Sequence, residues 1–329
     1  MQLRRRFSHF ESACTNFARG AYDSQFLAVV RRSHLAALAH KESVTLREVR
    51  AGVGLSPSTP PLLLGKTDVS SKTLFILGCG SSINQLGRQH FVEMENGYSI
   101  GINAWVSHDF VPNAYSFEAD RFSEPPSSEL LEMSRALRDK VSVKPEIELF
   151  LLRPKRSDLM HRMVEIPPQS RDRAFMYGRV NFVSRSSKVL REDMGVVMRQ
   201  RSARFGKEQV FLDNGASVVR MVGLGLVAGY EKIVLAGIDL NSNPNFWEGS
   251  DAPVQYRDMA KTYSRTPAPR HGTLETIERP FSTLSFLEAM ASAAKEYFGA
   301  TIFYASEGSA LAGKIPKYPW AKQGLWVKN

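Results

Sequence analysis

From residue 72 onward, the chain alternates short apolar runs with amphipathic stretches. The first run, Thr73 to Leu77, is apolar without alternation, which is typical of a strand buried on both faces of a parallel sheet. Gly78 and Gly80 follow and allow a tight turn, and Ser81 and Ser82 are good N-cap residues for a helix. A strand, a Gly-rich turn and a helix start bring free amides and the helix dipole together. The pattern therefore predicts an anion site, or else a plain strand-to-helix turn.

The same pattern recurs along the chain. Further strands are expected over 98–103, 113–117, 147–152 and 231–239, and helices over 129–140 and 217–228. Helices that return to buried strands are βαβ crossovers, and a series of them predicts an α/β fold, a Rossmann-like parallel sheet flanked by helices. Residues 153–210, rich in Arg and Lys with several prolines, are expected to form an inserted lid or small subdomain.

Polar residues and glycines fall where the predicted strands end and the helices begin. Ligands of parallel α/β sheets bind beyond the carboxyl ends of the strands. The residues expected at this edge on strand ends or helix starts are Gly78, Gly80, Asn103, Glu118, Ser217, Gly237 and Asp239.

The first 70 residues have a different character. They are basic and mostly helical in pattern, and Pro and Gly between residues 51 and 71 indicate a linker, so the main domain is expected at 71–329. The helix predicted in this N-terminal region either packs on the main domain or contacts anionic lipid. The lipid contact would use basic side chains: Arg4, Arg5, Arg6, Arg31 and Arg32.

Composition narrows the partners. The net charge of +10 suits acidic substrates, a nucleic acid or an anionic membrane surface, but no nucleic-acid-binding motif is present. No apolar run approaches the roughly 20 residues that span a bilayer, and no apolar core follows the basic N-terminus. Cys14 and Cys79 offer neither a disulfide framework nor a metal cluster. We expect a cytoplasmic protein, either free or peripheral on the inner face of the cell membrane.

The Gly-Cys-Gly turn has three competing interpretations. A dinucleotide site would place a third Gly where Ile83 stands, and a phosphate loop would need Gly-Lys-Ser/Thr, which is absent. A methyltransferase usually has an acidic residue just before the turn, where Ile76 and Leu77 stand here. A mononucleotide pocket remains, with a methyltransferase that binds S-adenosylmethionine as the alternative.

Several segments together resemble the bacterial sialyltransferases of glycosyltransferase family 42. Residues 76–83 are similar to that family's Gly-x-Gly-Pro-Ser-Leu turn, and Gly-Ile-Asn-Ala-Trp at 101–105 is similar to its second strand. The most specific segment is 217–239, a Ser-led helix followed by Gly-Tyr-Glu-Lys-Ile and a strand that closes in Gly-Ile-Asp. The Ser-Glu-Gly-Ser-Ala-Leu segment at 306–311 is similar to a turn near the family's C-terminal end. The resemblance covers roughly residues 72–315.

The resemblance implies a GT-A-like transferase that moves sialic acid or a related nonulosonic acid from a CMP-sugar to a glycan hydroxyl. Reaction would invert the anomeric centre without a cofactor or metal, in the synthesis of a surface glycan such as lipopolysaccharide or capsule. His271 would be the general base, in keeping with an imidazole pKa near 6.5, and His108, which follows Asn103 closely, is the second candidate. The implied nucleotide-binding residues are Gly78, Gly80, Ser81, Asn103, Glu118, Ser217, Gly237 and Asp239.

The chain also departs from the family pattern. Ser81 stands in place of Pro, Asn214 in place of an Arg, and Asn241 and Trp247 in place of two tyrosines that hold the leaving phosphate. Asn214 and Asn241 are therefore the expected leaving-group contacts. The expected partners are the nucleotide-sugar donor and the glycan acceptor. Whether the chain forms a homo-oligomer is left open by the sequence. A non-catalytic nucleotide-sugar-binding protein on the same fold is the alternative outside enzymes.

Overall fold

The computed structural model describes residues 28–53, 72–118, 128–153, 167–181, 187–202, 210–241, 244–248, 252, 254 and 281–320. Among these residues, no helix combines the length and apolar character needed to cross a bilayer.

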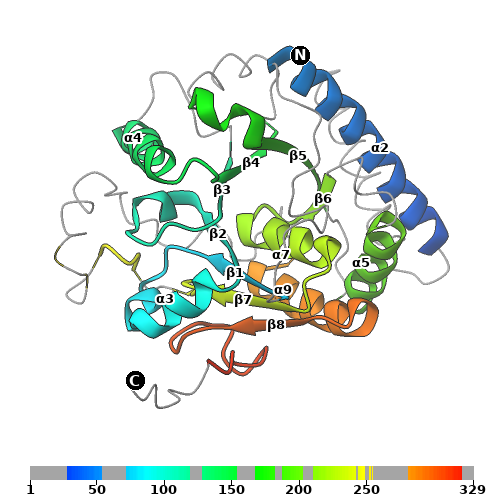
Figure 1. The fold of residues 1–329 in the computed structure, drawn as a ribbon. Helices are drawn as coiled ribbons and strands as arrows, with labels where there is room; N and C mark the ends of the chain where they lie inside the picture. Colours follow the sequence, from blue (N-terminus) through cyan, green and yellow to red (C-terminus); the bar gives the residue numbers. More distant parts are fainter. Residues whose placement is uncertain are drawn as a thin grey trace, which may run out of the picture.

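The described residues build one parallel sheet of eight strands in the order β6-β5-β4-β3-β2-β1-β7-β8 (Figure 1). The strands are β1 Thr73–Leu77, β2 Tyr98–Ile102, β3 Ala114–Glu118, β4 Glu148–Leu152, β5 Ala174–Asn181, β6 Val210–Asp213, β7 Lys232–Ala236 and β8 Thr301–Tyr304. The α/β, Rossmann-like fold expected from the sequence is confirmed.

Helices cover both faces of the sheet. The α-helices are α2 Ala28–Val53, α3 Arg88–Glu95, α4 Ser128–Val143, α5 Ser187–Ser202, α7 Ser217–Ala228 and α9 Thr283–Ala293. Leu74 and Ile76 of β1 pack with α5, α7 and α9, while Phe75 and Leu77 pack with α3 and α4. Alternate residues of one strand thus enter two cores, which explains its unbroken apolar run.

The order of the strands places a switch point between β1 and β7. Strands β2 to β6 are added on one side of β1, and α7 then returns across the sheet so that β7 pairs with the other side of β1 (Figure 1). The return is close, because a Cβ on Gly225 of α7 would lie 2.5 Å from Leu74. Ligands of open parallel sheets bind at the carboxyl edge beside such a point.

Three sequence expectations need correction. The Gly turn leads into a 3-10 helix, Ser81–Gln85, and α3 begins only at Arg88, because the turn's amides bond to other segments. Strand β2 ends at Ile102, and Asn103 begins a 3-10 helix. The described residues within 153–210 do not form an inserted subdomain. They belong to the main sheet, because β5 pairs with β4 and β6.

Helix α2 is part of the packed structure at the β5–β6 end of the sheet (Figure 1). Leu35 and Ala39 enter the core shared with α7, and Leu46 and Val49 enter the core on the opposite face. The helix therefore passes from one face of the sheet to the other. The expected domain boundary near Ser70 lies outside the described residues.

Candidate functional site

The Gly turn after β1 is bonded to the turn after β7. Gly78 N donates to Ala236 O and Gly80 N to Gly237 O, each at 2.8 Å. A Cβ on Gly78 would lie 2.6 Å from the Gly237 oxygen, and Gly237 itself has a φ of 65°. Only glycine therefore allows these two turns to approach so closely.

Asp239 holds the start of the following 3-10 helix. Its carboxylate accepts the Ser82 amide at 3.1 Å and the Ser82 hydroxyl, and Ser306 Oγ donates to Ser82 Oγ at 2.8 Å. All three residues are buried. The amides of Gly78, Gly80, Ser81 and Ser82 already donate to protein oxygens, Ser81 to Pro244 O, so a phosphate would have to be met by other atoms.

Asn103 is the unusual residue of this region. Its φ is 56°, and among the described residues only Leu240, with a φ of 54°, is another non-glycine residue with positive φ. Both stand at the carboxyl edge, Asn103 directly after β2 and Leu240 four residues after β7. Asn103 Oδ1 is buried without a hydrogen-bond partner. Backbone strain and an unpaired polar atom are features that cluster at functional sites.

Asn103 is adjacent to the Gly turn. Cys79 Sγ lies 3.6 Å from the carbonyl oxygen of Ile102, the residue before Asn103, and Cys79 O accepts from Phe246 N at 2.8 Å. The buried amide oxygen of Asn103 can accept a hydrogen bond from an amino group or a hydroxyl. The arrangement beside the switch point thus suits a neutral donor group of a ligand.

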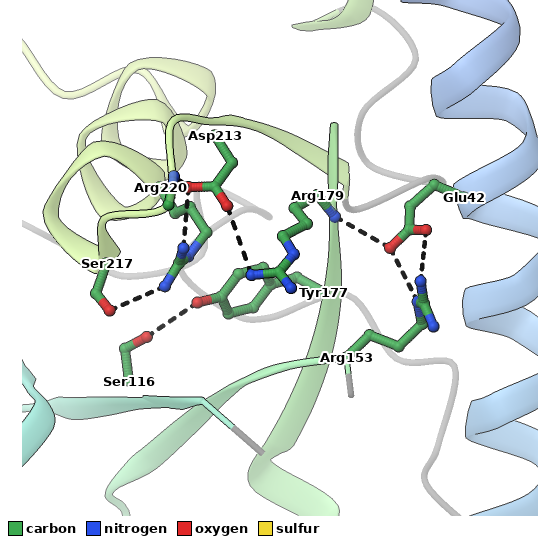
Figure 2. A network of polar contacts seen from close by, with 9 residues as sticks. Glu42, Ser116, Arg153, Tyr177, Arg179, Asp213, Ser217 and Arg220 are labelled. Atoms are coloured by element: carbon green, nitrogen blue, oxygen red, sulfur yellow. Dashed lines mark hydrogen bonds and ion pairs between the residues drawn. The ribbon is translucent and has the colours of Figure 1, made fainter. Parts of the chain in front are cut away.

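A second polar cluster lies at the carboxyl end of β6 (Figure 2). Asp213 Oδ1 accepts from Arg220 Nη1 at 2.9 Å and from Gly215 N at 2.7 Å, and Arg220 Nη2 donates to Ser217 Oγ at 2.9 Å. The side chains of Asp213 and Arg220 are 0% exposed. These residues fix the first turn of α7, where Ala216 at the N-cap position supplies no side-chain cap.

The remaining predicted contacts are spread along the same edge. Asn241 Nδ2 donates to Gly308 O at 2.6 Å, next to the switch point. Asn214 Nδ2 donates to Thr283 Oγ1 at 3.4 Å and joins the starts of α7 and α9, while its Oδ1 is buried without a hydrogen-bond partner. Glu118 is the last residue of β3. Strand β6, where the second cluster begins, is five strand positions from β1, and α7 crosses back from β6 towards β1.

His271 lies outside the described residues, whereas His108, the second candidate base, is described and buried. Its ring stacks on Trp105 with centroids 4.2 Å apart, and its Nδ1 accepts from Phe110 N at 3.0 Å. Burial lowers the pKa of His108 to about 4, although Asp109 opposes the shift. The ring is therefore neutral at pH 7, and its packing against Trp105 accounts for a histidine at this position.

Sequence reasoning missed Asp213, Arg220 and Arg179 as members of the edge. One signal was present, since Arg220 is the only charged residue in the apolar segment Ser217–Ala228. A charge at such a position is expected to be buried with a partner. Among the described residues, no three His, Cys, Asp or Glu side chains are grouped as metal ligands.

Comparison with known proteins gives one structural likeness. No family model matches the chain, and no curated protein matches it. Among solved structures, the chain is similar to the monofunctional alpha-2,3-sialyltransferase Cst-I from Campylobacter jejuni, with a TM-score of 0.41 and 16% sequence identity. The match covers 75% of this chain and 80% of that chain.

Proposed function

We propose that the protein is a glycosyltransferase that moves a nonulosonic acid, such as sialic acid, from a CMP-activated donor to a hydroxyl group of a glycan. The observation that carries the proposal is Asn103, strained and with a buried unpaired oxygen, beside the switch point between β1 and β7. A cytosine amino group or a ribose hydroxyl would supply the missing donor. The segments that resemble the sialyltransferase family support the same function, since they occupy the turn after β1, the end of β2 and the α7–β7 unit.

The reaction would proceed as a single displacement. The base takes the proton of the acceptor hydroxyl, the acceptor oxygen bonds to the anomeric carbon, and the bond to phosphate breaks on the opposite side. CMP leaves with the electron pair, so the anomeric centre is inverted. The positive end of α7, with Ser217 and Asn214, would stabilise negative charge on the donor, and Asn241 would assist from the β7 side.

His271 is the proposed base, because it follows the Gly-Ile-Asp strand in an irregular stretch of sequence, where the resembling family places its catalytic His. We propose that no metal is needed, because a leaving group with a single phosphate can be stabilised by amides and hydroxyls.

Nucleotide binding tests the proposal. CMP should raise the melting temperature more than UMP, AMP or S-adenosylhomocysteine, with about 2.7 kcal/mol of stabilisation at 100 times its dissociation constant. Asn103→Gly is the matched variant, since glycine keeps the left-handed backbone and removes only the amide. It should weaken CMP binding by about tenfold, the value of one hydrogen bond, in calorimetric titration. Equal shifts for all nucleotides, or none at millimolar CMP, would refute the proposal, and a preference for S-adenosylhomocysteine would favour a methyltransferase.

A further inference from the structure

Where β4 ends, the side chain of Glu42 in α2 becomes a hydrogen-bond partner of the neighbouring strand β5. Its carboxylate accepts from Arg153 Nε at 2.9 Å and Nη2 at 2.8 Å, and from the backbone amide of Arg179 in β5 at 3.1 Å (Figure 2). Arg153 is the residue directly after β4. Gly178 makes this approach feasible, because a Cβ there would lie 2.6 Å from Glu42 Cγ.

From Arg179, the contacts continue to the start of α7. The Arg179 side chain faces Asp213, with Nη1 at 3.7 Å from Oδ2, and the other Asp213 oxygen accepts from Arg220, which donates to Ser217 (Figure 2). Glu42 contacts Arg179 at its backbone amide, and from the Arg179 guanidinium onward the charges alternate in sign. The exposed fractions are 13% for Glu42, 18% for Arg179 and 0% for Asp213 and Arg220. Solvent therefore screens these interactions less than it screens surface pairs.

We propose that Glu42 is a positioning residue for the ligand site: through Arg179, Asp213 and Arg220 it sets the orientation of Ser217 at the start of α7. The inference rests on the proposed function, since it assigns Ser217 a role towards the donor's anionic groups.

The direction of the last hydrogen bond explains how the effect reaches a ligand. Ser217 Oγ accepts from Arg220, and a serine hydroxyl that accepts a hydrogen bond can donate one as well. The plane of the Arg220 guanidinium is fixed by Asp213, and Asp213 is steadied in turn by Arg179. Loss of the Glu42 charge would weaken its hydrogen bond to the Arg179 amide. The resulting shift of Arg179 would change the positions of Asp213 and Arg220, and through them the orientation of the Ser217 hydroxyl.

A double-mutant cycle tests this coupling. Glu42→Gln should lower CMP affinity about three- to tenfold in the full-length protein, whereas Glu48→Gln, on the exposed side of the same helix, should leave it unchanged. In a Ser217→Ala background the effect of Glu42→Gln should fall below about twofold, because coupled residues are not additive. Equal fold-changes in both backgrounds would overturn the proposal.

A second variant separates positioning from anchoring of α2. Arg179→Gln leaves the bonds between Glu42 and Arg153 in place and removes the ion pair to Asp213. It should reproduce the loss of affinity caused by Glu42→Gln, and an unchanged affinity would show that Glu42 only anchors the helix. If the wild-type protein binds no CMP, the proposed function fails, and the coupling is then read from melting temperatures of Glu42→Gln, Arg220→Met and the double variant. Non-additive shifts support the coupling and additive shifts refute it.

Discussion

The two polar clusters of the carboxyl edge are built from different interactions. At the switch point, turns after β1, β7 and β8 meet through glycines, backbone amides and the hydroxyls of Ser82 and Ser306, with the carboxylate of Asp239 as the one charge among these contacts. At the corner where β5, β6 and α7 meet, Asp213 lies between Arg179 and Arg220, and hydrogen bonds from Gly215 and to Ser217 complete the cluster. The side chains of Asp213 and Arg220 have no exposed surface.

This difference predicts different sensitivities. Neutral hydrogen bonds contribute about 1 kcal/mol each, while a buried charge left without its partner costs several times as much. The corner also depends on residues far apart in sequence, since Glu42 and Arg179 are 137 positions apart. The switch point should therefore tolerate single polar changes, and the corner should not.

The largest effect is expected from Asp213→Asn. The substitution keeps the shape but leaves Arg220 buried without its countercharge, so the free energy of unfolding should fall by about 3–5 kcal/mol in urea denaturation. Glu231→Gln is the control, because Glu231 pairs with Lys72 at the surface and should cost at most about 1 kcal/mol. A loss below about 1 kcal/mol for Asp213→Asn would remove the distinction between the two clusters.

Much of the switch-point region could be predicted because its signals are local. The run Thr73–Leu77, the glycines after it and the helix from Ser217 to a left-handed Gly229 all occur where the sequence indicates. Hydrophobic period and glycine preference act over a few residues, so one segment is sufficient to recognise them. The sequence did not predict that the amides of this turn donate to other protein segments, because their acceptors are on β7 and in the chain after it.

The corner could not be read from the sequence for a related reason. Strand β5 carries Gly178 and Arg179, which look unsuited to a buried strand until Glu42 is placed beside them. The pattern of α2 gave no hint of this contact, since its buried residues enter two different cores. Pairing over more than a hundred residues leaves no local trace.

A smaller effect, confined to acid pH, is expected beside the switch point. Because burial lowers the pKa of His108 to about 4, the unfolded chain binds more protons than the folded one between pH 6.5 and 4. The stability due to the neutral ring is complete above pH 6.5 and should fall by about 2 kcal/mol by pH 5. His108→Gln, which can still accept from Phe110 N, should lose this slope in denaturation measured at pH 7.5 and pH 5. An identical slope in both proteins would show that other groups cause it.

The smallest effect is expected for Ser306→Ala. Ser306 donates to Ser82, whose own hydroxyl donates to Asp239, so the alanine removes one neutral hydrogen bond and leaves the carboxylate with both of its contacts to Ser82. The free energy of unfolding should therefore fall by about 1 kcal/mol, and CMP affinity should change less than twofold. Ser292→Ala, at an exposed position of α9, is the matched control and should stay within about 0.5 kcal/mol of the wild-type value. A loss of 3 kcal/mol or more for Ser306→Ala would mean that the hydroxyls at the switch point support the fold as strongly as the buried charges at the corner, and the comparison between the two clusters would no longer hold.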